Sequence, residues 1–403
     1  MNSTHPKADS SASSFGRHLL DQWLLDPQVA YLNHGTVGAT PRRVLEAQRD
    51  WQARIERQPA AVLAREISPL MGVKPRAPGA LRAAADAVAR FLGVEGRDLV
   101  FVDNATAGVV SVLRSFALAP GDEIAITDHT YGAVANVARF VARERGAAVT
   151  SAALPFPAAD PQAVAEAFAA ALTEQTRIAV IDHVSSDTAL VMPVAELAAL
   201  ARARGIAVLV DGAHAPGAVP VDVASLGVDW YTANMHKWAM APRPCGVLWA
   251  APGRQEGLHP PVVSWGLDQG MLAEFDWVGT RDPTPWLAAP EGIAFMTELG
   301  LEAMQVHNHA LVLEAAEMLS AKWGTPFQAN PEMTGAMASV VLPESLDASE
   351  AGADALRDAL WFEDRIEVHM ARRGGRLWTR LSAQVYNELA DYERLAVAVA
   401  ARA

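Results

Sequence analysis

Short apolar runs rich in β-branched residues alternate with longer stretches of helical spacing as far as about residue 300. Runs of about four or five apolar residues are typical of buried strands, and longer amphipathic stretches are typical of helices. The predicted strands are 99–102, 123–127, 177–181, 207–210, 229–232 and 246–249, and the predicted helices include 133–144, 161–172 and 194–204. This alternation predicts an α/β fold with a mainly parallel, doubly wound sheet, whose ligands bind at the carboxyl ends of the strands.

The pattern changes near Leu301. A long helical stretch at 301–322 precedes shorter segments at 338–342, 351–360 and 377–382, which predict a smaller α+β domain. The first 16 residues are polar, rich in Ser and without an apolar core, as expected of a disordered tail and not of a signal peptide. The predicted organisation is a tail at 1–16, an N-terminal segment with the large domain at 17–300, and a small C-terminal domain at 301–403.

Composition narrows the classes of function. Of 403 residues 51% are hydrophobic and 20% charged, and the formal net charge is -13. An acidic surface repels phosphate backbones and anionic lipid, so we expect a small-molecule partner and neither nucleic acid nor a membrane. No apolar run is long enough to span a bilayer. One cysteine, Cys245, excludes an internal disulfide and a cysteine-built zinc site, so we expect no metal and a cytoplasmic location.

Two polar signatures follow predicted strands in the first half of the chain. The first reads DNATAG over 103–108, before a helical stretch. Small residues at such a turn expose backbone N–H groups that can bind a phosphate, and Thr106 adds a hydroxyl. The alternative is a turn in which Asn104 or Thr106 only caps the helix. The second reads TDHTYG over 127–132. Its Tyr131 could stack on a flat cofactor or could be a partly buried loop tyrosine.

Two later signatures supply an acid and a lysine. Asp211 ends a predicted strand, where it could hydrogen bond a protonated pyridine nitrogen or cap a turn. His214 could reach a phenolic oxygen or be a satisfied core histidine. A single lysine is usually solvated surface, but Lys237 follows His236 within the apolar context ANMHKWAM, which favours the free amine.

These residue types point to pyridoxal phosphate (PLP). A lysine amine can form an imine with the PLP aldehyde, and an acid can keep the pyridine nitrogen protonated so that the ring accepts electrons. The order of the two signatures, with the acid at one strand end and the lysine after the next strand, suits such a site. The sequence therefore predicts a PLP enzyme, with Lys237, Asp211 and His214 as its catalytic residues.

Six motifs occur in a fixed order: NAT at 104–106, TDHTYG at 127–132, DGAHAPG at 211–217, HKW at 236–238, GTRDP at 279–283 and RLSAQVYN at 380–387. In this order the chain resembles the class V aminotransferase family of PLP enzymes, and within it the isopenicillin N epimerase-like group. The similarity extends over nearly everything after about Leu24, including YLNHG at 31–35. The resemblance implies the PLP-dependent transferase fold type I, on which members catalyse different reactions.

The resemblance also implies roles, position by position. Lys237 would form the imine, Asp211 would contact the pyridinium, and His214 would lie near the phenolic oxygen. Tyr131 would take the ring-stacking position, where relatives place His. The other cofactor-binding residues implied are Ala105, Thr106 and His236 at the phosphate, Asn234, and Thr280 from a loop that in relatives reaches the phosphate of the neighbouring subunit. A homodimer with shared active sites is therefore implied.

On the substrate side, Arg380 matches the arginine that grips the substrate carboxylate, a contact that suits its planar fork. Asn33 and His34 are implied over the same side of the pocket. The persulfide-forming cysteine of the family's cysteine desulfurases sits in the C-terminal part of the chain, where this sequence has no cysteine. A desulfurase that uses a protein persulfide is therefore not expected, whereas direct carbon–sulfur elimination stays open.

The expected function is labilisation of the Cα–H of an α-amino acid moiety on a larger metabolite of the kind found in secondary metabolism. The reaction would be epimerisation or carbon–sulfur β-elimination from a cysteine S-conjugate. One alternative is a class V aminotransferase or a cysteine-desulfurase-like enzyme acting on a small amino acid. A second alternative is a PLP-binding module without turnover.

Overall fold

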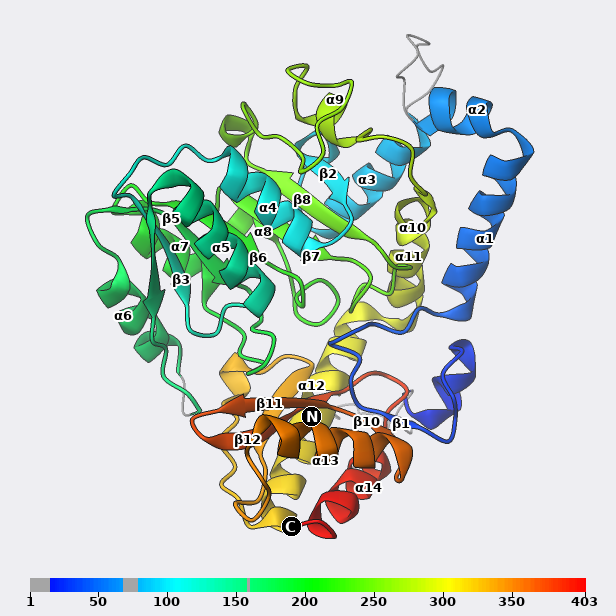
Figure 1. The fold of residues 1–403 in the computed structure, drawn as a ribbon. Helices are drawn as coiled ribbons and strands as arrows, with labels where there is room; N and C mark the ends of the chain where they lie inside the picture. The colour runs from blue at the N-terminus through cyan, green and yellow to red at the C-terminus, as the bar shows by residue number, and fades with distance from the viewer. Residues whose placement is uncertain (1–14, 68–78, 158–159) are drawn as a thin grey trace, which may run out of the picture.

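The computed structural model describes residues 15–67, 79–157 and 160–403, and its main element is a seven-stranded sheet (Figure 1). The strand order is β2-β8-β7-β6-β5-β3-β4. The strands are β2 (Leu99–Val102), β3 (Glu123–Thr127), β4 (Ala148–Ala152), β5 (Thr176–Asp182), β6 (Ala207–Asp211), β7 (Trp230–Asn234) and β8 (Gly246–Ala250). The pairs from β7 to β4 are parallel, and β8 is antiparallel to β7 and β2. The prediction of a mainly parallel sheet is confirmed.

Helices cover both faces of this sheet. On β5, Ile178 and Val180 belong to the core that includes residues of α4 and α5, whereas Ala179 and Ile181 belong to the core with α6 and α7. A strand buried on both faces reads as a continuous apolar run, which is why its position was predictable. The helices of this part are α1 (Arg42–Arg57), α2 (Pro59–Ala61), α3 (Ala80–Phe91), α4 (Ala105–Ser115), α5 (Gly132–Arg145), α6 (Pro161–Ala171), α7 (Val194–Arg202), α8 (Val223–Leu226), α9 (Met271–Phe275), α10 (Thr284–Leu287) and α11 (Ala289–Leu299).

One strand of the large sheet, β4, was not predicted. It is the edge strand beside β3, and its first four residues are exposed or half-buried. An edge strand needs no continuous apolar run, so the sequence AVTSA carries little strand signal. Its parallel pairing with β3 holds it in place.

A second layer contains the antiparallel sheet β11-β12-β9 and three helices. These elements are α12 (Leu301–Trp323), β9 (Met337–Val341), α13 (Glu350–Phe362), β10 (Ile366–Glu367), β11 (His369–Arg373), β12 (Arg376–Ser382) and α14 (Leu389–Ala400). This layer confirms the predicted smaller α+β part of the fold. The N-terminal strand β1 (Ala30–Tyr31) pairs in parallel with β10. Leu32, the next residue, belongs to the hydrophobic core that these C-terminal elements form. Residues 1–14 of the predicted tail lie outside the described residues, while the Gly16 amide donates to the carbonyl of Val385 at 2.8 Å.

The C-terminal layer lies against the carboxyl ends of the parallel strands (Figure 1). The Arg373 guanidinium on β11 donates to the carbonyl of Asp128, just after β3, at 3.0 Å. On β12, the Arg380 guanidinium donates to the carbonyl of Ser186, after β5, at 2.7 Å. The loops at this edge of the large sheet are therefore enclosed between the two layers. Within the described ranges, no helix combines the length and apolarity needed to cross a bilayer.

Candidate active site

A cavity of about 400 Å³ opens where the parallel strands end. It is lined by Asn104, Ala105, Thr106, Tyr131, Asp182, Val184, Ser186, Asp211, Ala213, His214, Asn234, His236 and Lys237. The structure thus brings together most of the residues that the sequence analysis assigned to a cofactor. These residues come from the ends of β3, β5, β6 and β7 and from the start of α4, as expected when ligands bind at the carboxyl ends of parallel strands.

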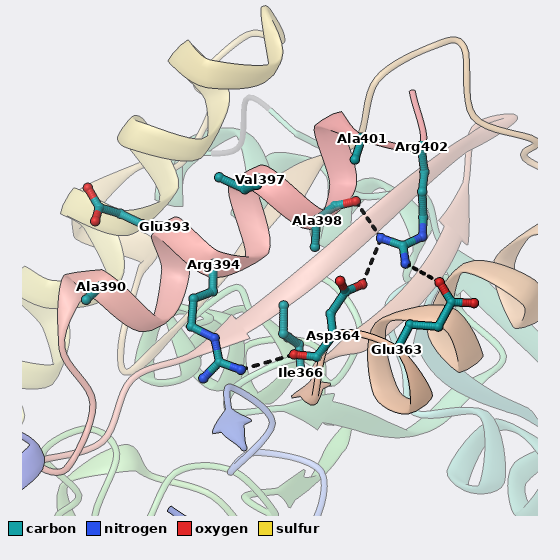
Figure 2. A pocket seen from close by; sticks show the side chains of 10 residues that line it. All are labelled: Glu363, Asp364, Ile366, Ala390, Glu393, Arg394, Val397, Ala398, Ala401 and Arg402. Atoms are coloured by element: carbon teal, nitrogen blue, oxygen red, sulfur yellow. Dashed lines mark hydrogen bonds and ion pairs between the residues drawn. The ribbon is translucent and has the colours of Figure 1, made fainter. Parts of the chain in front are cut away.

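A larger depression, of about 760 Å³, lies on the outer side of the C-terminal layer between α13 and α14 (Figure 2). Its charged groups are already paired: Arg402 lies 2.7 Å from both Glu363 and Asp364, and Arg394 donates to the carbonyl of Asp364 at 3.0 Å. The residues that line it come from the C-terminal layer and include no strand end of the large sheet. We therefore place the chemistry in the smaller cavity.

The start of α4 forms the anion-binding end of the cavity. Asn104 caps the helix, because its side-chain oxygen accepts from the Ala107 amide at 3.0 Å. The Ala105 amide donates to Oδ1 of Asn234 at 2.8 Å, which ties α4 to the end of β7. Thr106 lines the cavity at the first turn, where the helix dipole favours negative charge. Asn104 therefore does act as a helix cap, and the same turn can also face a phosphate.

Gly108 lets α4 approach β7 closely. A Cβ at this position would overlap the hydroxyl of Thr232 and lie 2.8 Å from its Cβ. The glycine thus positions the helix start over the strand that leads to Asn234 and Lys237.

His236 projects from the loop between β7 and β8. Its Nδ1 lies 3.0 Å from the amide nitrogen of Cys245. It also lies 2.8 Å from the carbonyl oxygen of Cys245, which can only accept, so the two contacts of Nδ1 correspond to opposite tautomers of the ring. Burial lowers the pKa of His236 to about 4, so the ring is neutral near pH 7. In the tautomer that carries the proton on Nε2, this neutral ring can donate to an anion at the cavity.

Lys237 and His214 lie side by side in the cavity wall. The Nζ atom of Lys237 lies 3.0 Å from Nε2 of His214. Burial, followed by the positive charge of Arg380, lowers the pKa of Lys237 to about 7, although Asp211 opposes the shift. Burial also lowers the pKa of His214 well below its ordinary value, with a further contribution from Lys237. A large fraction of Lys237 is therefore a free, nucleophilic amine near neutral pH.

Asp211 ends β6 and is almost fully buried, at 3% exposure. Its Oδ1 accepts from the Ala213 amide at 2.9 Å. Burial raises the pKa of Asp211, whereas that amide and the charge of Lys237 oppose the rise. A buried carboxylate with few partners is suited to bind a cationic group, such as a protonated pyridine nitrogen.

Tyr131 begins the turn into α5, and its ring is 46% exposed. The residue lines the cavity, and its backbone amide points to Oδ1 of Asp182 at 3.4 Å. Tyr131 is thus part of the cavity wall, and its stacking on a flat cofactor stays a prediction.

Arg380 lies behind the cavity wall, with 1% of its surface exposed. One terminal nitrogen donates to the carbonyl of Ser186, which lines the cavity, and the other contacts Asn33 Oδ1 at 3.1 Å and the hydroxyl of Thr36. Burial lowers its pKa to about 10, so it stays protonated at neutral pH. Asn33 is itself held by Glu367, whose carboxylate accepts from Nδ2 at 2.7 Å. The side chains of Arg380 and Asn33 thus form a buried, hydrogen-bonded cluster next to Ser186.

Besides Arg380 and Asn33, which lie behind its wall, two further expected site residues do not line the cavity. His34 is fully buried beneath Lys237: its Nδ1 lies 2.8 Å from the hydroxyl of Tyr386 and its Nε2 lies 3.2 Å from the carbonyl of Lys237. It supports the lysine backbone and faces no substrate region in this chain. Thr280 is exposed and stands apart from the cavity, next to Arg281, which packs 4.1 Å over the ring of Trp286.

Three residues of the cavity wall were not predicted: Asp182, which ends β5, and Val184 and Ser186, which follow it. The signal was present, because Asp182 directly follows the apolar run 178–181 just as Asp211 follows 207–210. Asp211 also opens the motif DGAHAPG, whereas no such motif follows Asp182, so this acid was left unassigned. Ser186 has no motif of its own, and its place in the wall depends on Arg380 from the C-terminal layer.

The cavity fits PLP. Two buried polar atoms in its wall, Nδ1 of His214 and Oδ2 of Asp182, have no hydrogen-bond partner, so a polar ligand would satisfy them. An anion-binding helix start, a free lysine amine and a buried acid lie around one space of about 400 Å³. This combination matches a phosphorylated pyridine aldehyde.

Comparison with known proteins agrees with this geometry. The family model "Aminotransferase class-V" matches residues 39–353. Isopenicillin N epimerase of Streptomyces clavuligerus is 35% identical over 394 residues, covering 93% of this chain and 95% of that protein. The probable chloroplastic L-cysteine desulfhydrase of Arabidopsis thaliana is 34% identical over 428 residues, covering 98% of this chain and 86% of that protein.

Solved structures match as well. The complex of the cystine C-S lyase C-DES with its product cysteine persulfide has a TM-score of 0.76 at 21% identity, covering 92% of this chain and 97% of the other. A C-DES mutant with glycine covalently linked to its PLP cofactor gives the same TM-score and identity, with 94% and 98% covered. Matches at this identity show the fold, which is that of the type I PLP enzymes. With the family model and the relatives at 35% and 34% identity, they establish that the chain belongs to the aminotransferase class-V family.

Proposed function

We propose that this chain is a PLP-dependent enzyme that removes the Cα proton of an amino-acid substrate at the cavity around Lys237. The observation that supports this most directly is the Lys237 amine, with a pKa of about 7, lying 3.0 Å from His214 in the same cavity as Asp211. PLP, when bound, supplies an aldehyde for the lysine amine and a ring that takes up electron density from the substrate Cα.

The residues that would hold PLP follow from the geometry. Thr106 at the start of α4 and, in the tautomer with Nε2–H, His236 would bind the phosphate, beside Ala105, whose own amide already donates to Asn234. Asp211 would bind the pyridine nitrogen. A ring nitrogen of His214, either Nδ1, which has no hydrogen-bond partner, or Nε2, would contact the phenolic oxygen. Tyr131 would contact the ring, while Asn234 acts indirectly by holding the Ala105 amide.

Lys237 then has a second task, as the base for the substrate Cα–H. A base works best when its pKa lies near the working pH, and Nζ meets this condition. His214 is neutral and within hydrogen-bond distance of Nζ, so it can orient the amine without competing for positive charge. Arg380 supplies the buried positive charge that attracts an α-carboxylate, through the wall formed by Ser186.

We further propose that the reaction is epimerisation or carbon–sulfur β-elimination from a cysteine S-conjugate. The relatives bear names of both kinds, an isopenicillin N epimerase and an L-cysteine desulfhydrase, at closely similar identity. Both reactions begin with loss of the Cα proton, so the same lysine serves either. The substrate would be an amino acid carried on a larger metabolite.

A persulfide mechanism has little support in this structure. Cys245 is fully buried next to β8, and burial raises the pKa of its thiol far above the ordinary value. A protonated, inaccessible thiol cannot attack a substrate sulfur. Elimination without a protein persulfide therefore fits the chain better than cysteine desulfurase chemistry.

We also propose a homodimer. An exposed apolar segment at 262–267 includes Val262, Val263 and Trp265, the last with 81% of its surface exposed. Val262 and Arg281 line one small cavity, so the segment lies beside the loop that carries Thr280. A second copy seated there would cover apolar surface and bring Thr280 next to a neighbouring subunit.

The reaction is tested by incubating the PLP-loaded enzyme with D- and L-amino acids, cysteine S-conjugates and a β-lactam amino acid, and by scoring pyruvate, keto acid and racemised product separately. Pyruvate with a released thiol indicates elimination, and inverted substrate indicates epimerisation. A keto acid retaining the whole side chain indicates transamination. A cofactor spectrum that no substrate changes would favour a PLP-binding module without turnover and would contradict the proposal.

A further inference from the structure

Two buried acids face the cavity side by side. Asp182 and Asp211 end the neighbouring parallel strands β5 and β6, and their Cα atoms are partners in the register of the two strands. Side chains at paired positions of neighbouring strands lie on the same face of a sheet. Both residues line the cavity, and each is 3% exposed.

The two carboxyl groups have unequal partners. Asp211 accepts from the Ala213 amide at 2.9 Å and lies close enough to Lys237 for the positive charge to stabilise its ionised form. The Oδ1 atom of Asp182 faces the Tyr131 amide at 3.4 Å, and its Oδ2 has no hydrogen-bond partner. The Thr130 hydroxyl and backbone amides also lower the pKa of Asp182, so it is the positive charge of Lys237 beside Asp211 that favours a negative charge on Asp211 over one on Asp182.

Two adjacent buried carboxylates do not both stay ionised, because each charge raises the proton affinity of the other. Burial raises the pKa of Asp182 well above its ordinary value, and the charge of Asp211 raises it further. From the neighbouring elements, Lys237 and His214 face the pair from the β6 and β7 ends, and the Tyr131 amide and Thr130 hydroxyl face it from the β3 end. The charge of Lys237 lowers the pKa of Asp211, while burial keeps His214 neutral.

We propose that Asp182 holds the proton of this acid pair and leaves Asp211 as a single negative charge toward the cavity. Asp182 is thus a positioning residue, which acts through Asp211. Its protonated Oδ2 is a hydrogen-bond donor in the buried wall of the cavity. This inference rests on the proposed function in that the charge of Asp211 is the partner of the PLP pyridine nitrogen. The placement of the proton itself does not depend on PLP.

The first experiment is infrared difference spectroscopy on the full-length apoprotein at neutral pH. Wild type minus Asp182→Asn is expected to contain the carbonyl stretch of a buried protonated carboxyl, and wild type minus Asp211→Asn is expected to contain carboxylate bands. Absence of the protonated-carboxyl band from the first spectrum, or its presence in the second instead, would overturn the proposal. Because no cofactor is involved, this result stands even if PLP fails to bind.

The second experiment follows the pH dependence of the rate at which apoprotein combines with PLP, which reports the free-amine fraction of Lys237. Asp211→Asn removes a negative charge that raises the lysine pKa, so the midpoint should move to lower pH. Asp182→Asn replaces one neutral group by another, so the midpoint should stay at the wild-type value. A downward shift in Asp182→Asn as large as that in Asp211→Asn would show that Asp182 is ionised and would overturn the proposal.

The positioning role is tested in turnover. Asp182→Ala removes the donor and should lower kcat at least about tenfold, since hydrogen bonds to charged groups contribute strongly, and Asp182→Asn should recover most of that loss. Unchanged kcat in Asp182→Ala would remove Asp182 from a role in the reaction. If Asp182→Ala does not fold, the comparison of Asp182→Asn with Asp211→Asn in the first two experiments decides whether Asp182 holds the proton. If the wild-type chain does not bind PLP while the infrared band belongs to Asp182, the proposed function fails and the proton placement holds.

Discussion

At the scale of single residues, the site depends on side chains whose environment changes their chemistry. Lys237 and Asp211 were predictable from the sequence, because each follows an apolar strand in a recognisable motif. Asp182 was missed for want of a motif, and His34 was expected on the substrate side although it supports the lysine backbone. A sequence shows which residues have reactive side chains. The orientation of the buried ring of His34, however, depends on partners distant in sequence, such as Tyr386.

The charge of Asp211 should matter more for turnover than for PLP binding. Asp211→Asn retains a carbonyl oxygen for the Ala213 amide but cannot stabilise a pyridinium, so we expect kcat to fall at least about tenfold while most PLP affinity remains. Absorbance titration with PLP and steady-state rates measure the two effects. Asp358→Asn, an exposed acid of α13, is the control. Unchanged turnover would remove Asp211 from the site.

The fork of Arg380 should be needed for substrates that carry an α-carboxylate. Its guanidinium contacts Ser186, Asn33 and Thr36 within the buried wall. Lysine keeps the charge and loses the planar fork, so kcat/KM on an amino acid should fall at least about tenfold.

Steady-state kinetics of Arg380→Lys on an amino acid and on its decarboxylated analogue test this prediction. The analogue should show little change. Arg376→Lys, on the same strand but paired with Glu344 near the surface, is the matched control. An equal loss on both substrates would indicate that Arg380 is structural.

At the scale of elements, the strands buried on both faces were predictable and the edge strand β4 was not, since the latter needs no apolar run. The start of α4 was predictable as a turn, because small residues follow a strand. Its tie to β7 through Asn234 and Ala105 was not, since the two residues are 129 positions apart.

The approach of α4 to β7 gives a test at this scale. Gly108→Ala would force a Cβ into the hydroxyl of Thr232, so the helix start must move away, with a loss of about 1–3 kcal/mol of stability and weaker PLP binding. Gly132→Ala, at the start of α5, meets no atom within 4 Å and is the control. Thermal melts and PLP titration measure both variants. Equal behaviour of the two would contradict the role given to Gly108.

At the scale of the whole molecule, two layers that are distant in sequence close over one edge of the large sheet. The predicted division into a large and a small part is visible, but local patterns could not show that β1 pairs with β10 or that Arg380 reaches Ser186. Such contacts join residues more than about 190 positions apart, and no periodicity within one segment encodes them.

The exposed segment at 262–267 leads to a prediction about assembly. Sedimentation should give about twice the chain mass at micromolar concentration, and Trp265→Glu should shift the protein toward monomer, because burying a new charge opposes association. Phe362→Glu, on an exposed position of α13, should leave the assembly unchanged. A monomeric wild type, or equal effects of the two substitutions, would contradict the proposed dimer.

The central claim is that Lys237 is the residue that binds PLP covalently, and borohydride reduction followed by peptide mapping tests it most directly. The chain has four lysines, Lys7, Lys74, Lys237 and Lys322, so the assignment is simple. We expect the reduced adduct on Lys237, trapped faster as the pH rises through about 7, because the amine is nucleophilic only after it loses its proton. Lys237→Ala should give no adduct, and Lys322→Ala a normal one. An adduct on another lysine, or one that persists in Lys237→Ala, would contradict the account.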